Sequence, residues 1–134
     1  MLDHVFGDQS MVNGKLWPYL EVARGKYRFY VVNGCGSRVL TLSLNPPVGT
    51  LSFTIIGTEG GLLEAPVSGV QLLTLGPGER YDVVVDFAGQ PAGTEIRMVA
   101  SAATARPSAT CSWAASGTAK MSGSSFLSIS SRSL

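Results

Sequence analysis

A chain of 134 residues has the length of a single domain. Its 16 glycines, 7 prolines and charged fraction of only 14% favour a turn-rich, sheet-rich domain over a helical or disordered one. The net charge is +1 and the basic residues form no cluster, so electrostatics alone offers no surface for nucleic acid or a charged membrane. No apolar run approaches the roughly 18 residues that a membrane helix needs.

The first predicted element is a hairpin over residues 11–17, MVNGKLW. Asn13 and Gly14 lie between apolar flanks, and this dipeptide suits a type I′ turn, which needs positive φ at both central positions. Pro18 ends the second arm, because proline cannot donate a hydrogen bond to a neighbouring strand.

Six strand-like runs follow, separated by turns that contain glycine or proline: 26–32, 38–44, 51–58, 70–75, 81–87 and 94–100. Pro66 is expected in a short connector between the third and fourth runs. Seven or eight short strands at roughly ten-residue spacing predict an all-β sandwich or barrel. No window carries the apolar stripe of an amphipathic helix.

Period-two alternation divides the side chains of each predicted strand between two faces. In the run 26–32, Tyr27, Phe29 and Val31 share one face, and Arg28 and Tyr30 share the other. In the run 81–87, Val83 and Val85 lie on the face opposite Val84.

The composition changes at about residue 100, which divides the chain into a predicted domain at 6–100 and a tail at 101–134. The tail holds eleven serines and seven alanines and no acidic residue, a composition typical of flexible linkers. A short strand around Phe126, Leu127 and Ile129 is the one element that we expect there.

The inventory of metal ligands is small: one histidine, His4, and two cysteines, Cys35 and Cys111. A blue-copper site needs two histidines and a cysteine, and a zinc site needs closely spaced ligand pairs; neither pattern occurs. A lone histidine also makes no catalytic constellation. We therefore expect no catalytic, cofactor-binding or metal-binding residue. One disulfide or two thiols remain open alternatives for the cysteines.

Motifs for nucleophilic catalysis or nucleotide binding are missing too. No Gly-x-Ser-x-Gly elbow occurs, and the glycines at 34 and 36 lack the third glycine and the helix of a dinucleotide fingerprint. Gly60 and Gly61 are better explained by a backbone requirement for positive φ than by phosphate binding.

Acidic residues gather around one arginine in a segment that contains Glu79, Arg80, Asp82 and Asp86. The last three share one face of their predicted strand, and a structural ion-pair face is the expected role. The alternative is an acid–base pair of a small hydrolase.

Four segments in one order resemble the middle cupredoxin-like domain of three-domain bacterial multicopper oxidases, of the laccase, spore-coat laccase and bilirubin oxidase type: 7–22, 26–44, 53–67 and 75–87. The resemblance covers about residues 6–100 and implies a Greek-key cupredoxin-like β-sandwich. It implies that copper lies in the first and third domains, and that the middle domain holds none and spaces the other two. The parent reaction implied is oxidation of phenolic substrates coupled to reduction of dioxygen to water.

The tail departs from this resemblance, which would lead into a third domain. A truncated fragment or a frameshifted reading are the two hypotheses for it. A stand-alone interaction module that docks through Trp17 and Tyr19 is a further alternative, as is self-association. No export signal is visible at the N-terminus, although the resembled family is often secreted, periplasmic or part of the spore coat.

Overall fold

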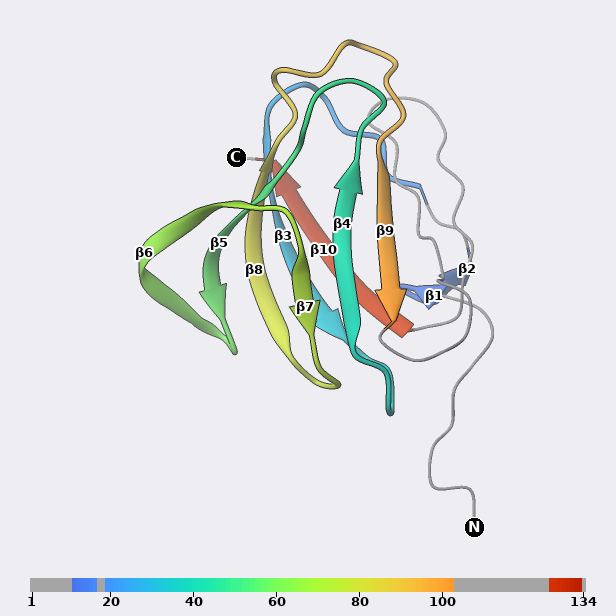
Figure 1. Ribbon diagram of the computed structural model, residues 1–134, viewed down its shortest axis with the longest axis vertical. Helices are drawn as coiled ribbons and strands as arrows, with labels where there is room; N and C mark the ends of the chain where they lie inside the picture. Colours follow the sequence, from blue (N-terminus) through green and yellow to red (C-terminus); the bar gives the residue numbers. More distant parts are fainter. Residues whose placement is uncertain (1–10, 17–18, 103–125, 134) are drawn as a thin grey trace.

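The computed structural model describes residues 11–16, 19–102 and 126–133 (Figure 1). These residues form ten strands and no helix, so none of them builds a helix that could cross a membrane. In chain order the strands are β1 (Met11–Val12), β2 (Lys15–Leu16), β3 (Lys26–Asn33), β4 (Leu40–Asn45), β5 (Phe53–Thr58), β6 (Gly61–Val70), β7 (Leu73–Leu75), β8 (Arg80–Asp86), β9 (Arg97–Ala102) and β10 (Phe126–Ser133).

The strands form two sheets. The larger has the order β2-β1-β10-β3-β8-β5-β6, and the smaller has the order β7-β4-β9. All the pairings are antiparallel except that of β1 with β10. Buried side chains from both sheets belong to one hydrophobic cluster, which confirms the predicted all-β sandwich.

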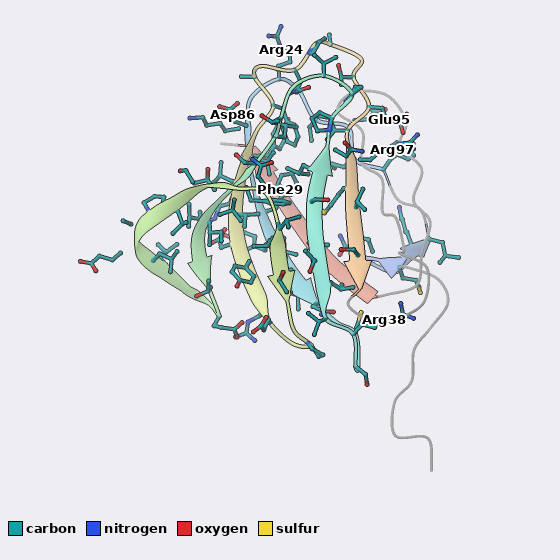
Figure 2. The ribbon with its side chains drawn as sticks, viewed as in Figure 1. Arg24, Phe29, Arg38, Asp86, Glu95 and Arg97 are labelled. Atoms are coloured by element: carbon teal, nitrogen blue, oxygen red, sulfur yellow. The ribbon has the colours of Figure 1, made fainter. Side chains whose placement is uncertain are left out.

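The core follows the predicted alternation. Phe29 and Val31 on β3 are at most 1% exposed, whereas Arg28 and Tyr30 lie on the other face. The rings of Phe29 and Phe87 meet edge to face with centroids 6.3 Å apart, a favoured aromatic geometry. Figure 2 shows Phe29 within the sandwich, while charged side chains such as Asp86 lie at its periphery.

The predicted Asn-Gly turn is confirmed. Asn13 and Gly14 have φ of 51° and 76° between β1 and β2. A second turn of this kind joins β5 to β6, where Glu59 and Gly60 have φ of 52° and 88°. Positive φ therefore falls on the first residue of the Gly60-Gly61 pair and on the glutamate before it.

Two sequence predictions are wrong. The segment around Pro66 is not a connector: it lies inside β6, the ten-residue edge strand of the larger sheet, where a missing N–H is tolerated. The run 70–75 is not one strand, because Val70 ends β6 and Leu73 begins β7 in the other sheet. The described residues therefore form ten strands, and this number includes β1 and β2, the two short arms of the hairpin.

The strand expected in the tail is present and is longer than predicted. β10 lies between β1 and β3, with Ile129 opposite Val31. The domain boundary at residue 100 remains a prediction; β9 continues to Ala102.

Candidate functional site

The outer face of the larger sheet carries the acidic group singled out in the sequence. Arg80, Asp82 and Asp86 project from β8 on this face, while Val83 and Val85 between them are buried. The neighbouring strand β3 adds basic and aromatic side chains, because the β3–β8 register pairs Tyr30 with Asp82 and Lys26 with Asp86.

Asp82 is held by Arg28 in a forked ion pair. The Nε of Arg28 lies 2.9 Å and 3.1 Å from the two carboxylate oxygens, and Nη2 donates to Oδ2 as well. The two side chains are 30% and 13% exposed, so this pair is more enclosed than the other ion pairs in the described residues. The hydrogen bond with Asp82 raises the pKa of Arg28, with desolvation acting against it. Both oxygens of Asp82 are engaged, which leaves it poorly suited to act as a general base.

Tyr30 lies against the same arginine. The guanidinium carbon of Arg28 is 4.8 Å from the centre of the Tyr30 ring, within the range of a cation–π contact. The arginine is thereby fixed from two sides, by a carboxylate and by an aromatic face.

Arg80 has a different role, which is to fix the β5–β6 turn against β8. Its Nη2 lies 3.0 Å from the carboxylate of Glu59 and 3.2 Å from the carbonyl oxygen of the same residue. The backbone N–H of Arg80 donates to the Glu59 carboxylate at 2.8 Å, and the N–H of Glu59 donates to the Arg80 carbonyl at 3.1 Å. This reciprocal set holds Glu59 at the positive φ that the turn requires.

The two remaining acids serve the backbone. Asp86 lies 3.9 Å from Lys26, a long and exposed pair, and accepts a hydrogen bond from the N–H of Ala88 at 2.9 Å. Glu79 accepts one from the N–H of Gly76 at 2.5 Å and so closes the turn before β8. The acidic group is therefore divided among separate structural contacts, as the ion-pair interpretation predicts.

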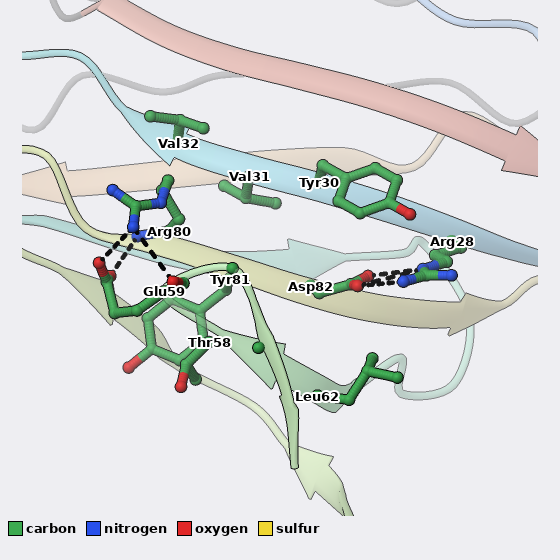
Figure 3. Close-up of a pocket in the computed structure, with 12 residues that line it drawn as sticks. Arg28, Tyr30, Val31, Val32, Thr58, Glu59, Leu62, Arg80, Tyr81 and Asp82 are labelled. Carbon is green, nitrogen blue, oxygen red and sulfur yellow. Dashed lines mark hydrogen bonds and ion pairs between the residues drawn. The ribbon is translucent and has the colours of Figure 1, made fainter.

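A depression of about 360 Å³ lies beside the Arg28–Asp82 and Arg80–Glu59 pairs, at the β5–β6 turn (Figure 3). Its wall includes Arg28, Tyr30, Arg80 and Asp82 together with Leu62 of β6, which is 73% exposed. The volume is at the low end of the range for ligand sites. Its carboxylates are already paired with arginines, and no nucleophile–base pair lines it. The hydrolase interpretation finds no support here.

No group of three histidine, cysteine or acidic residues in the described part of the chain is arranged to hold a metal ion. His4, Trp17 and Cys111 lie outside the described residues. Cys35 is half-buried and packs against the core, and Tyr19 is 56% exposed.

Sequence reasoning missed the structural role of Asn33, which directly follows the predicted strand 26–32. Asn33 is fully buried at the end of β3, and its side chain makes three hydrogen bonds. Nδ2 donates to the carbonyls of Arg38 at 2.7 Å and Leu75 at 3.0 Å, and Oδ1 accepts from the N–H of Cys35 at 3.0 Å. Asn33 thus joins the end of β3 in one sheet to the end of β7 in the other.

With the fold described, relatives can be compared. No family model matches the chain. It is 44% identical over 98 residues to a multicopper oxidase LPR1 homolog 5 from Oryza sativa subsp. japonica, covering 72% of the chain. It is 46% identical over 81 residues to a laccase from Bacillus subtilis, covering 60% of the chain. Each match spans about 15% of the relative's own length.

Solved structures of multicopper oxidases also superpose on this chain. The multicopper oxidase McoA from the hyperthermophile Aquifex aeolicus superposes with a TM-score of 0.67 at 30% identity, covering 74% of this chain and 23% of that one. Its 2F4 variant gives 0.69 at 29% identity, covering 78% and 24%. The fold is therefore a cupredoxin-like sandwich of the type found in multicopper oxidases. The chain itself is a multicopper oxidase-related domain, as the sequence resemblance implied.

Proposed function

We propose that this chain is a copper-free structural domain of a laccase-like multicopper oxidase, the middle one of three. The observation that carries the proposal is the length of the match: 81–98 residues at 44–46% identity, amounting to about 15% of each relative. A segment of that size is one domain of a larger enzyme. The remaining domains of such a parent are the partners that we propose.

The donor inventory of this chain supports a role without its own copper. A blue-copper site, with two imidazoles and a thiolate, needs two histidines, and the chain has one. In the parent, copper would be held by the other domains and would supply oxidation of phenolic substrates coupled to dioxygen reduction.

The residues of this domain would then provide rigidity instead of chemistry. The Arg28–Asp82 and Arg80–Glu59 pairs fasten β8 to β3 and to the β5–β6 turn. Asn33 fastens the larger sheet to the smaller one. Such contacts suit a body that keeps two neighbours at a fixed separation.

Copper titration of the purified chain tests the copper-free part of the proposal. We expect no intense thiolate-to-copper absorption and no oxidation of a phenolic dye, with Bacillus subtilis laccase as the positive control. A Cys35→Ala variant shows whether the Cys35 thiol is the source of any absorption that is seen. An intense absorption that saturates at stoichiometric copper, whether or not it survives Cys35→Ala, would overturn the proposal.

The encoding DNA tests the parent. We expect coding sequence for histidine-rich copper domains on both sides of this segment, in the same frame or in a shifted one. Flanking sequence without such domains in any frame would contradict the assignment as a middle domain.

A further inference from the structure

The tripeptide Val-Asn-Gly occurs twice in this chain, at residues 12–14 and 32–34. In an Asn-Gly pair the backbone nitrogen of the glycine can attack the side-chain carbonyl of the asparagine, because glycine has no side chain to hinder the approach. Asparagine in such a pair is therefore susceptible to spontaneous deamidation. Since the two sites share the same three residues, a large difference in their reactivity has to come from the fold.

The first site lies on an exposed turn. Asn13 and Gly14 are both exposed and join β1 to β2. A Cβ added at Gly14 would meet nothing within 4 Å, so the space beside this residue is open. The β1–β2 register closes with Val12 opposite Lys15, which leaves the Gly14 N–H in the loop and outside the paired residues of the two strands.

The hairpin around this turn is short. β1 and β2 have two residues each, and Figure 1 shows them at one margin of the sandwich, where β2 is the edge strand of the larger sheet. Hairpins of this size are marginally stable, and such segments open locally at a small cost in free energy. Attack on the Asn13 side chain requires rotation of the backbone at this residue, and local opening of the hairpin allows that rotation.

The second site is closed by packing and by hydrogen bonds. Asn33 is fully buried, and its Nδ2 donates to the carbonyls of Arg38 and Leu75 while its Oδ1 accepts from the N–H of Cys35. Nδ2 is the atom that leaves in deamidation, so these bonds have to break before the reaction. Each bond corresponds to a factor of about five in an equilibrium constant, and three together to a factor of about a hundred or more.

We propose that Asn13 is a site of spontaneous deamidation in the folded protein, and that the fold protects Asn33. In the first step a bond forms between the Gly14 nitrogen and Cγ of Asn13, and the Cγ–Nδ2 bond breaks. The amide proton of Gly14 goes to the departing nitrogen, which leaves as ammonia. Water then opens the resulting succinimide at either carbonyl and gives aspartate or isoaspartate. Water is the only co-reactant, and nothing is oxidised or reduced.

The two products alter the molecule in different ways. The new carboxylate of either product takes the formal net charge from +1 to 0, and proteins without net charge associate more readily. Isoaspartate also adds a methylene to the main chain, which then no longer fits a two-residue turn. Aspartate leaves the main chain unchanged and tolerates positive φ. The β1–β2 pairing therefore survives in one product and is lost in the other. This inference does not depend on the proposed function.

Peptide mapping by mass spectrometry tests the proposal, because trypsin leaves each of the two asparagines as the only one in its peptide, at residues 1–15 and 29–38. The full chain is incubated at mildly alkaline pH, which favours loss of the proton from the attacking nitrogen, and circular dichroism checks that it stays folded. We expect Asn13 to convert to aspartate and isoaspartate at least about a hundredfold faster than Asn33. In urea that unfolds the chain, the two rates should agree within about twofold.

Asn13→Gly is the matched control, because glycine accepts positive φ and has no amide to lose. Its peptide 1–15 should stay unmodified; a mass gain that persists in this variant would place the modification at Gln9 and contradict the proposal. The proposal is also wrong if the folded chain converts Asn13 no faster than Asn33, or if Asn13 converts only in urea. An Asn33 that stays unreactive in urea would show that the difference does not come from the fold.

Discussion

Removing the Asn33 side chain should destabilise the fold more than any change at an exposed polar residue. Asn33→Ala deletes three hydrogen bonds inside the protein, to Arg38, Leu75 and Cys35. A hydrogen bond of this kind contributes about 1 kcal/mol net, so the loss should be about 3 kcal/mol. A domain of this size has a free energy of unfolding of about 5–15 kcal/mol, so the change is a large fraction of it.

Urea unfolding followed by circular dichroism is the assay. With a urea dependence of about 2 kcal/mol/M, the midpoint should fall by about 1.5 M. Asn45→Ala is the control, because Asn45 ends β4 and is exposed; it should change stability by less than about 0.5 kcal/mol. The reasoning about this buried amide is wrong if the free energy of unfolding of Asn33→Ala lies within about 0.5 kcal/mol of the native value. It is also wrong if the urea midpoint of Asn33→Ala is no lower than that of Asn45→Ala.

Two further substitutions probe the outer face and the β5–β6 turn. Arg28→Met should lower the thermal midpoint more than Lys26→Met does. The first change leaves the enclosed carboxylate of Asp82 without its ion-pair partner, whereas Asp86, the partner of Lys26, is about half exposed. Equal midpoints for the two variants would contradict this ranking. Gly57→Ala should destabilise by about 1–3 kcal/mol, because its Cβ would lie 2.5 Å from the carbonyl oxygen of the first residue of β6. Gly36→Ala is its control, since a Cβ there meets nothing within 4 Å; similar urea midpoints for both would exclude the steric argument.

The core was predictable because it depends on local alternation. A strand repeats every two residues, so Phe29 and Val31 had to face the same way, as did Val83 and Val85. The Asn13-Gly14 turn was predictable for a similar reason, since few dipeptides tolerate positive φ at both positions. The same alternation put Arg80, Asp82 and Asp86 on one face of β8.

The partners of those charges were not predictable. Arg28 lies 54 residues from Asp82, and Glu59 lies 21 residues from Arg80, and only the order of strands in the sheet brings them together. The burial of Asn33 was hidden in the same way, because its acceptor on Leu75 is 42 residues away. In the sequence, a polar residue at the end of a strand cannot be told from a loop residue. Only the position of the smaller sheet shows that the Asn33 side chain binds the backbone of Leu75.

The sequence by itself determined the all-β class, the inward and outward faces, the hairpin turn and the relation to multicopper oxidases. Each of these depends on short-range geometry or on motifs that can be read along the chain. Only the tertiary structure decided where Val70 and Leu73 separate into two sheets, and that the segment around Pro66 is an edge strand. Sheet membership depends on non-local hydrogen bonds and burial, and the period of two that marks a strand is the same in a central strand, an edge strand and either sheet.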